Sequence, residues 1–308
     1  MFINKIKSIS KVLCFFILVF LGAQPLLGQN QTFSYIQFMD NLTPINPNYS
    51  LMDNMGSVNI IANKELVGIS GGPSTYLFNA NLPIHSIGSS VGLTILNEQL
   101  AIEKVTEINS FFAKSIRLSN KQFLALSLNA GIKNYVSNTT SLDPTDPSFK
   151  QDIRQTSPNI GFGIMVYSDT YYLGFSLPEI TITSIGSAIN PNNTNFNRHY
   201  FLAGGLLIKL SDDFHFKPAA LFSYTEGLKG SADISGTFYW KEVFGLGVDY
   251  NTNQLLAGIL SLNIDQFHIG YSYRVGTQSI NIGGLGTGTN EIALSYRFGS
   301  RLIKPRLL

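Results

Sequence analysis

The residues best suited to bind a metal ion are the four histidines, His85, His199, His215 and His268, and they lie far apart in the sequence. None of them has a cysteine or a carboxylate at the short spacings that zinc sites use. His199, His215 and His268 fall on the polar side of the strand pattern described below. We therefore interpret them as solvated residues, and we predict neither a metal ion nor any other cofactor.

Three glutamates in one stretch, Glu98, Glu103 and Glu107, are the best candidates for acid-base chemistry. Paired acids need a shared site within reach of the proton that they transfer. Here the glutamates flank a predicted outer loop, and we expect them to keep that loop solvated.

Two loops carry motif-like patterns. The glycine-rich run at 283–288 has no strand-then-helix context and no Lys-Ser or Lys-Thr ending, so it indicates a flexible loop and not a phosphate cradle. Asp143 and Asp146 alternate with prolines, but the stretch lacks the glycine and the final glutamate of a calcium loop, which favours a turn. No G-x-S-x-G motif occurs, and no Ser/His/Asp order stands out. We predict that the protein is not an enzyme.

Composition indicates the class of protein. Charged residues make up 13% of the 308 residues, while apolar residues reach 44%, with 28 Gly, 14 Tyr and 22 Phe. Few charges, many glycines and many aromatics are typical of an outer-membrane barrel, whereas a soluble sandwich usually carries more Lys and Glu outside. The net charge is +2 without a basic block, so nucleic acid is not an expected partner.

The N-terminus reads as an export signal. Three lysines precede the apolar run 12–21, which is too short to span a bilayer. We predict a signal peptide at 1–28, with an uncleaved anchor as the alternative; cleavage after Ala23 competes with cleavage after Gly28. Cys14 lies inside the apolar run, so the mature chain would have no thiol.

Residues 29–56 show little periodicity, and we expect an irregular segment that either fills a lumen or covers a rim.

From residue 57 onward, strand-like alternation recurs. The closing stretch Thr289–Phe298 is typical: Ile292, Leu294 and Tyr296 share one face of a strand, and polar side chains share the other. About fourteen such segments follow one another, at 57–63, 74–82, 87–96, 105–118, 121–136, 158–168, 170–177, 199–210, 213–224, 229–239, 241–251, 254–263, 265–275 and 289–298. The pattern predicts an all-β, antiparallel transmembrane barrel at 57–298, followed by a basic tail at 299–308.

The connections support this fold. Longer and shorter links alternate along the chain, as expected for outer loops and periplasmic turns, with 64–73, 97–104, 137–157, 178–198 and 276–288 on the outer side. Pro218 lies mid-segment and removes a ladder donor, so we expect a bulge or a split strand there.

The inward positions carry charges of both signs. Mixed charges at close range more often pair to fill a lumen than line a selective pore. The inward polar residues are Asn129, Lys133, His215, Lys217, Asp249, His268, Arg274, Glu291 and Arg297.

A set of motifs in order along the mature chain resembles the PorP/SprF family of type IX secretion system membrane proteins. The N-terminal motif residues are Gln37, Met39, Asn41, Asn46, Pro47 and Tyr49, with Asn48 where the family usually has alanine and Leu66 where it has tryptophan. Later matches are Gly92, Asn97, Asp146, Pro147, Gly174, Pro178, His199, Lys217, Pro218, Glu291, Arg297 and Phe298.

The resemblance implies a non-enzymatic outer-membrane barrel of Bacteroidota that acts in type IX secretion and gliding. The expected partners are outer-membrane lipid, periplasmic ring or motor components, and secreted adhesins with a C-terminal sorting domain. The motif residues are candidate interaction sites. Two other functions stay open: a passive porin or small-molecule transporter, and a soluble secreted sandwich that acts as an adhesin.

Overall fold

The structure is a computed structural model that describes residues 35–52, 55–142, 151–181, 197–277 and 288–299. All of them belong to one compact unit, Thr32–Leu308. The predicted signal peptide, Asp143, Asp146, Pro147 and the tail beyond Gly299 lie outside the described residues. Within these ranges there is no helix with the length and apolarity that a membrane crossing requires.

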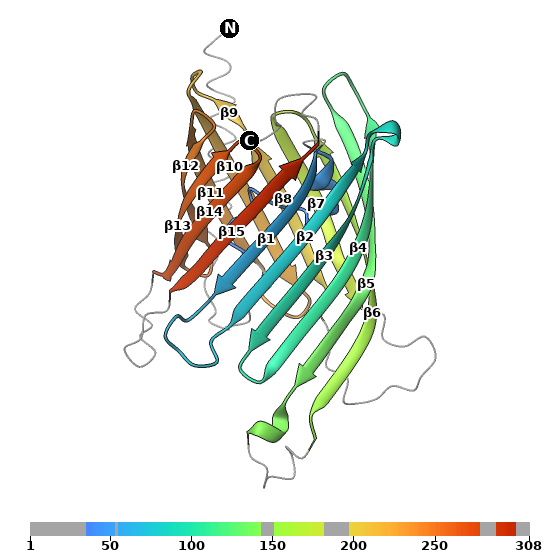
Figure 1. Cartoon of the computed structure of the whole chain (residues 1–308), viewed down its shortest axis with the longest axis vertical. Helices are drawn as coiled ribbons and strands as arrows, with labels where there is room; N and C mark the ends of the chain where they lie inside the picture. The colour runs from blue at the N-terminus through green and yellow to red at the C-terminus, as the bar shows by residue number, and fades with distance from the viewer. Residues whose placement is uncertain (1–34, 53–54, 143–150, 182–196, 278–287, 300–308) are drawn as a thin grey trace. The chain divides into compact units, whose positions relative to one another are not determined.

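The strands join one antiparallel sheet that closes on itself as a barrel, which excludes the sandwich alternative (Figure 1). Neighbours in the sheet follow chain order, β15 pairs with β1, and β10 pairs with β11 to complete the wall. The strands are β1 (Gly56–Lys64), β2 (Ser74–Ile84), β3 (Ser89–Leu100), β4 (Glu103–Arg117), β5 (Phe123–Ser137), β6 (Ile153–Tyr167), β7 (Tyr171–Thr181), β8 (His199–Leu206), β9 (Ile208–Lys209), β10 (Phe214–Thr225), β11 (Ser231–Trp240), β12 (Phe244–Asn251), β13 (Leu255–Ile264), β14 (Phe267–Gly276) and β15 (Thr289–Phe298).

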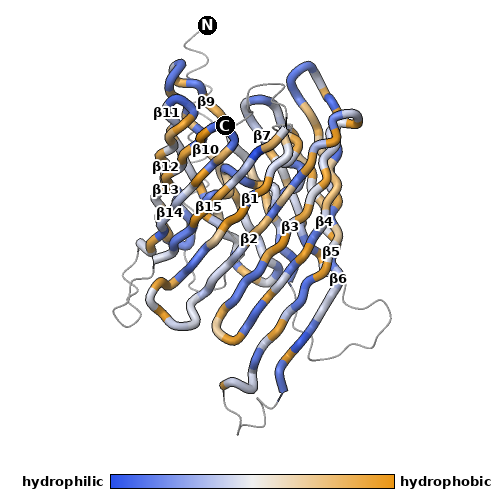
Figure 2. Tube along the Cα trace, in the orientation of Figure 1, coloured by the Kyte–Doolittle hydropathy of each residue, from blue (hydrophilic) through white to orange (hydrophobic). Residues whose placement is uncertain are grey.

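The predicted facing of the side chains is confirmed. Leu126 and Leu128 on β5 are 49% and 69% exposed, while Ser127 and Asn129 between and beside them are buried. The same alternation follows the strands as a change between apolar and polar residues (Figure 2). Because lipid surrounds such a wall, the exposed apolar face is the membrane-facing one.

The two ends of the barrel differ in their links. The longer links, 65–73, 138–152, 182–198 and 277–288, share one end, and the turns at 85–88, 118–122, 168–170, 210–213, 241–243 and 265–266 share the other. The end with the shorter turns is the periplasmic one. The predicted link 97–104 lies at the outer end as expected, but its predicted length is wrong: β3 and β4 continue until Leu100 pairs with Glu103, which leaves Ala101 and Ile102 as the turn.

Pro218 does not break its own strand, contrary to our expectation. β10 continues through it, and Pro218 pairs with Gly236 on β11. The interruption lies in the neighbouring strand, because β8 ends at Leu206 and β9 resumes at Ile208 in the same register against β10. Proline has no N–H to donate across this seam. On the other side of the seam the ladder to β7 continues in register, because the N–H of Leu207 donates to the carbonyl oxygen of Thr170, 2.8 Å away.

Candidate functional site: a segment bound in the barrel lumen

Residues 35–52, called the plug segment from here on, lie inside the barrel. Their side chains and backbone contact strands all round the wall, on β2, β6, β7, β10, β11, β14 and β15. Ile36, Phe38, Met39 and Leu42 are completely buried. Of the two placements that the sequence left open, the lumen is therefore the one found. The segment ends in a 3-10 helix, η1 (Pro47–Leu51), whose first N–H group, that of Asn48, is capped by the Asn46 side chain.

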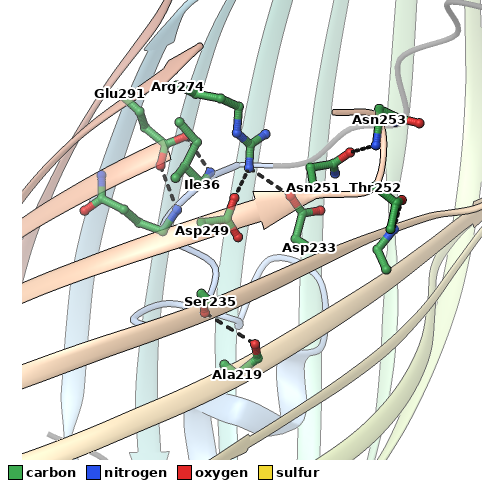
Figure 3. A network of polar contacts seen from close by, with 12 residues as sticks. Ile36, Ala219, Asp233, Ser235, Asp249, Asn251, Thr252, Asn253, Arg274 and Glu291 are labelled. Atoms are coloured by element: carbon green, nitrogen blue, oxygen red, sulfur yellow. Dashed lines mark hydrogen bonds and ion pairs between the residues drawn. The ribbon is translucent and has the colours of Figure 1, made fainter. Parts of the chain in front are cut away.

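Glu291 on β15 holds the beginning of the plug segment. Its carboxylate accepts the backbone N–H of Ile36 at 2.9 Å and that of Gln37 at 2.9 Å, one on each oxygen (Figure 3). The Asn63 amide donates a third hydrogen bond at 3.0 Å. The fully buried carboxylate of Glu291 thus supplies the acceptors for two backbone N–H groups of the plug segment.

Asp40 holds the middle of the plug segment to β10, β11 and β14. Its Oδ1 lies 3.1 Å from Lys217 Nζ and accepts the Tyr239 hydroxyl at 2.9 Å. His268 Nε2 lies 3.7 Å from Oδ2. Burial alone would raise the pKa of the Asp40 carboxyl, but Lys217, then His268 and the Tyr239 hydrogen bond, hold that pKa below its ordinary value. Asp40 is thus a charged link between three strands.

Asparagines hold the rest of the plug segment. Asn41 donates to Asn79 Oδ1 on β2 at 2.7 Å. The Asn46 amide donates to the carbonyl oxygens of Ile164 and Phe175, both at 3.3 Å. These two carbonyls belong to adjacent strands, β6 and β7, so the Asn46 amide links the plug segment to both strands.

Glycines in the wall make room for these side chains. A Cβ atom on Gly163 would lie 2.7 Å from Asn46 Oδ1, and one on Gly174 would lie 2.7 Å from Asn46 Nδ2. A Cβ on Gly270 would overlap the side-chain amide of Gln37. Glycine within a strand often marks a place where other backbone or a ligand approaches closely. Here the approaching group is the plug segment.

The structure brings most of the predicted motif residues together. Gln37, Met39, Asn41, Asn46, Pro47 and Tyr49 all lie in the plug segment. Arg297 borders a polar cavity of about 30 Å³ beside Asp40. Phe298 lies apart from this site and stacks against Tyr296 at 6.2 Å.

A second cluster corrects the interpretation of Glu107 as a solvated loop residue. Glu107 lies on β4, is buried, and places Oε1 2.6 Å from Lys133 Nζ on β5. Lys133 Nζ also lies 2.8 Å from Glu179 Oε1, which is 3.5 Å from His199 Nε2. Glu107 points inward because it shares a face of β4 with Phe111 and Ala113, which are buried.

The sequence pattern missed Glu179. Strict alternation from Leu173 and Phe175 would place residue 179 on the lipid side. The β6–β7 register shifts between Ile160 and Phe162, opposite Pro178. The extra residue on β7 reverses the facing, and Glu179 turns inward to Lys133. The Pro178 motif was the available signal.

A third cluster lies on β11, β12 and β14. Arg274 Nη2 is 2.6 Å from Asp249 and 2.8 Å from Asp233 (Figure 3). The expectation that inward charges pair is therefore confirmed for Lys133, Lys217 and Arg274.

The expectation of solvated histidines is wrong for His215 and His268, which are buried. In the described ranges, no three His, Cys, Asp or Glu side chains are grouped to hold a metal ion.

The chain is similar to Omp33 of Acinetobacter baumannii, with 6% identity and a TM-score of 0.48 over 80% of this chain and 99% of that one. It is also similar to the Pseudomonas putida toluene transporter TodX, with 9% identity and a TM-score of 0.47 over 83% and 93%. CdiB from Acinetobacter baumannii gives 8% identity and a TM-score of 0.41 over 80% of this chain, which spans 60% of CdiB.

A search of curated proteins gives no match. Residues 27–296 match the family described as type IX secretion system membrane protein PorP/SprF. The match includes the plug segment and nearly all of the barrel wall, so this protein is an outer-membrane member of the PorP/SprF family.

Proposed function

We propose that the protein is a non-enzymatic scaffold or partner barrel of the type IX secretion machinery, and that its lumen does not conduct solutes. The observation that carries this proposal is the plug segment, which is held by Glu291 on β15 and, through Asp40, by β10, β11 and β14. A pore for passive diffusion needs a water-filled lumen. Here buried side chains and paired charges occupy the interior of the described barrel.

The family supplies the class of partner. Periplasmic ring or motor components and secreted adhesins with a C-terminal sorting domain are the partners that we infer. Deleting the gene should reduce surface delivery of at least one sorting-domain protein, measured by surface labelling and proteomics of intact cells. Restoring the gene should restore delivery. Unchanged delivery of every such protein would refute this function.

A passive porin remains the second candidate, because polar side chains line the inner wall. Liposome swelling distinguishes the two functions. Purified protein in vesicles should give no faster entry of small sugars than vesicles without protein, while a general porin of known size provides the positive control. Rapid sugar entry would favour the porin.

We also infer that residues 1–28 are removed on export and that the basic tail at 299–308 serves a periplasmic contact. β15 ends with Phe298 at the end of the barrel that has the shorter turns, so the chain leaves the wall on the periplasmic side. N-terminal sequencing of the membrane form tests the first inference. Truncation after Phe298 tests the second: secretion at the normal rate would exclude a role for the tail.

A further inference from the structure

The membrane-facing wall carries an apolar groove, and one residue that lines it, Tyr239, also donates to Asp40 of the plug segment. It has a volume of about 610 Å³ and lies across β10–β14. The outward side chains that shape it include Phe214, Phe238, Trp240, Phe244, Leu246 and Leu260. Phe214, Trp240 and Phe244 flank the turns at 210–213 and 241–243, so the groove begins at the periplasmic edge of the membrane.

A cation stands at the periplasmic end of this groove. Lys241 Nζ lies 5.4 Å from the centre of the Trp240 ring, and the Lys241 side chain is exposed. The carboxylate of the neighbouring residue, Glu242, lies toward His215, with Oε1 3.9 Å from His215 Nε2. Another nearby carboxylate, that of Asp212, is paired with Lys209 at 2.7 Å. The groove thus has an apolar floor, an aromatic edge and one positive charge at headgroup level.

We propose that this groove binds one glycerophospholipid of the periplasmic leaflet, with an acyl chain along the groove and the phosphate on Lys241. A strand rises about 3.4 Å per residue, so the three steps from Val243 to Leu246 run roughly 10 Å along the strand, and a tilt of about 40° makes this roughly 8 Å of depth in the bilayer. That depth suits the upper part of an acyl chain. Lysine at a membrane interface lays its alkyl stem on apolar surface and keeps its ammonium group at the phosphates.

Trp240 makes the site directly observable, because it is the only tryptophan in the chain. Purified full-length protein in mild detergent is titrated with phosphatidylglycerol that carries brominated acyl chains, and quenching of Trp240 fluorescence is followed. The expected result is saturable quenching at low lipid concentration. Lys241→Ala should weaken half-saturation about fivefold, since one lysine near a lipid surface contributes ~1 kcal/mol.

The matched control is Lys114→Ala. Lys114 is also exposed near the periplasmic edge, but it lies on β4, remote from the groove. It should leave half-saturation unchanged. Leu260→Phe, which narrows the groove without adding charge, should weaken binding, and brominated diacylglycerol, which lacks the phosphate, should quench without saturation.

Heat-modifiable migration on gels shows that each variant has folded. Quenching that rises in proportion to lipid, or a Lys241→Ala curve identical to that of the unaltered protein, would show ordinary annular lipid only and would overturn the proposal. Neither result would affect the proposed secretion role, because Lys241→Ala and Leu260→Phe leave Tyr239 and its hydrogen bond to Asp40 in place.

Discussion

Replacing Asp40 by alanine should both destabilise the barrel and loosen the plug segment. Lys217 is completely buried, and its Nζ lies 3.1 Å from Asp40 Oδ1. Removing one partner of a buried ion pair costs about 3–5 kcal/mol, because the other charge stays in a low-dielectric site. The Tyr239 hydroxyl also loses an ionised acceptor, so we expect the upper part of that range.

A double-mutant cycle separates the pair from the packing around it. Lys217→Met should also be destabilising, whereas Asp40→Ala combined with Lys217→Met should recover most of the loss, because neither charge is left alone. The free energy of unfolding is measured by urea titration of protein folded into liposomes. Asp212→Ala, in an exposed pair with Lys209, is the control and should change stability by about 1 kcal/mol or less.

The coupling energy between Asp40 and Lys217 should be well above that between Asp212 and Lys209. If each single variant costs less than about 1 kcal/mol and the costs simply add, the buried link between Asp40 and Lys217 is not what holds the plug segment.

Three further predictions concern the pH dependence of stability, the space beside Gly270 and the two faces of β5. The pKa of the Asp40 carboxyl is held below its ordinary value. Its contribution to the free energy of unfolding is therefore present above the unfolded-state pKa and is lost as pH falls through the lower, folded-state pKa. The barrel should lose stability in that acid range, and Asp40→Asn should flatten the dependence of stability on pH. Gly270→Ala should cost about 1–3 kcal/mol by overpacking against the Gln37 amide, and a second change, Gln37→Ala, should recover it. Leu126→Arg should cost ~2–4 kcal/mol in assembly, while Ser127→Arg, facing inward, should cost less; equal costs would contradict the assigned faces.

The barrel wall could be predicted because its signal is local. Alternation in Thr289–Phe298 needs only neighbouring residues, and β15 is found with these bounds, paired from Gly56↔Phe298 to Lys64↔Asn290. The pairing of charges inside the lumen could also be predicted, because the inward positions of the strands carry charges of both signs. Boundaries were less accurate where a turn was short, as at Ala101 and Ile102.

The plug segment could not be placed from sequence because its partners are remote. Ile36 and Gln37 bond to a residue more than 250 positions away, and their own stretch has no repeating pattern. The motif residues indicated that the stretch matters, without showing what it contacts. Glu179 was missed for a different reason: one extra residue at Pro178 reverses parity, and no rule of strict alternation detects a bulge.

The most direct test of this account is ion conductance of the purified protein in planar lipid bilayers. The plug segment is expected to keep the lumen closed, so the unaltered protein should give no stable conductance. A variant that carries both Asp40→Ala and Glu291→Ala should show intermittent openings, because it removes both carboxylates that link the plug segment to the wall. Steady conductance by the unaltered protein, equal to that of the double variant, would contradict the claim that residues 35–52 are a fixed part of the barrel interior.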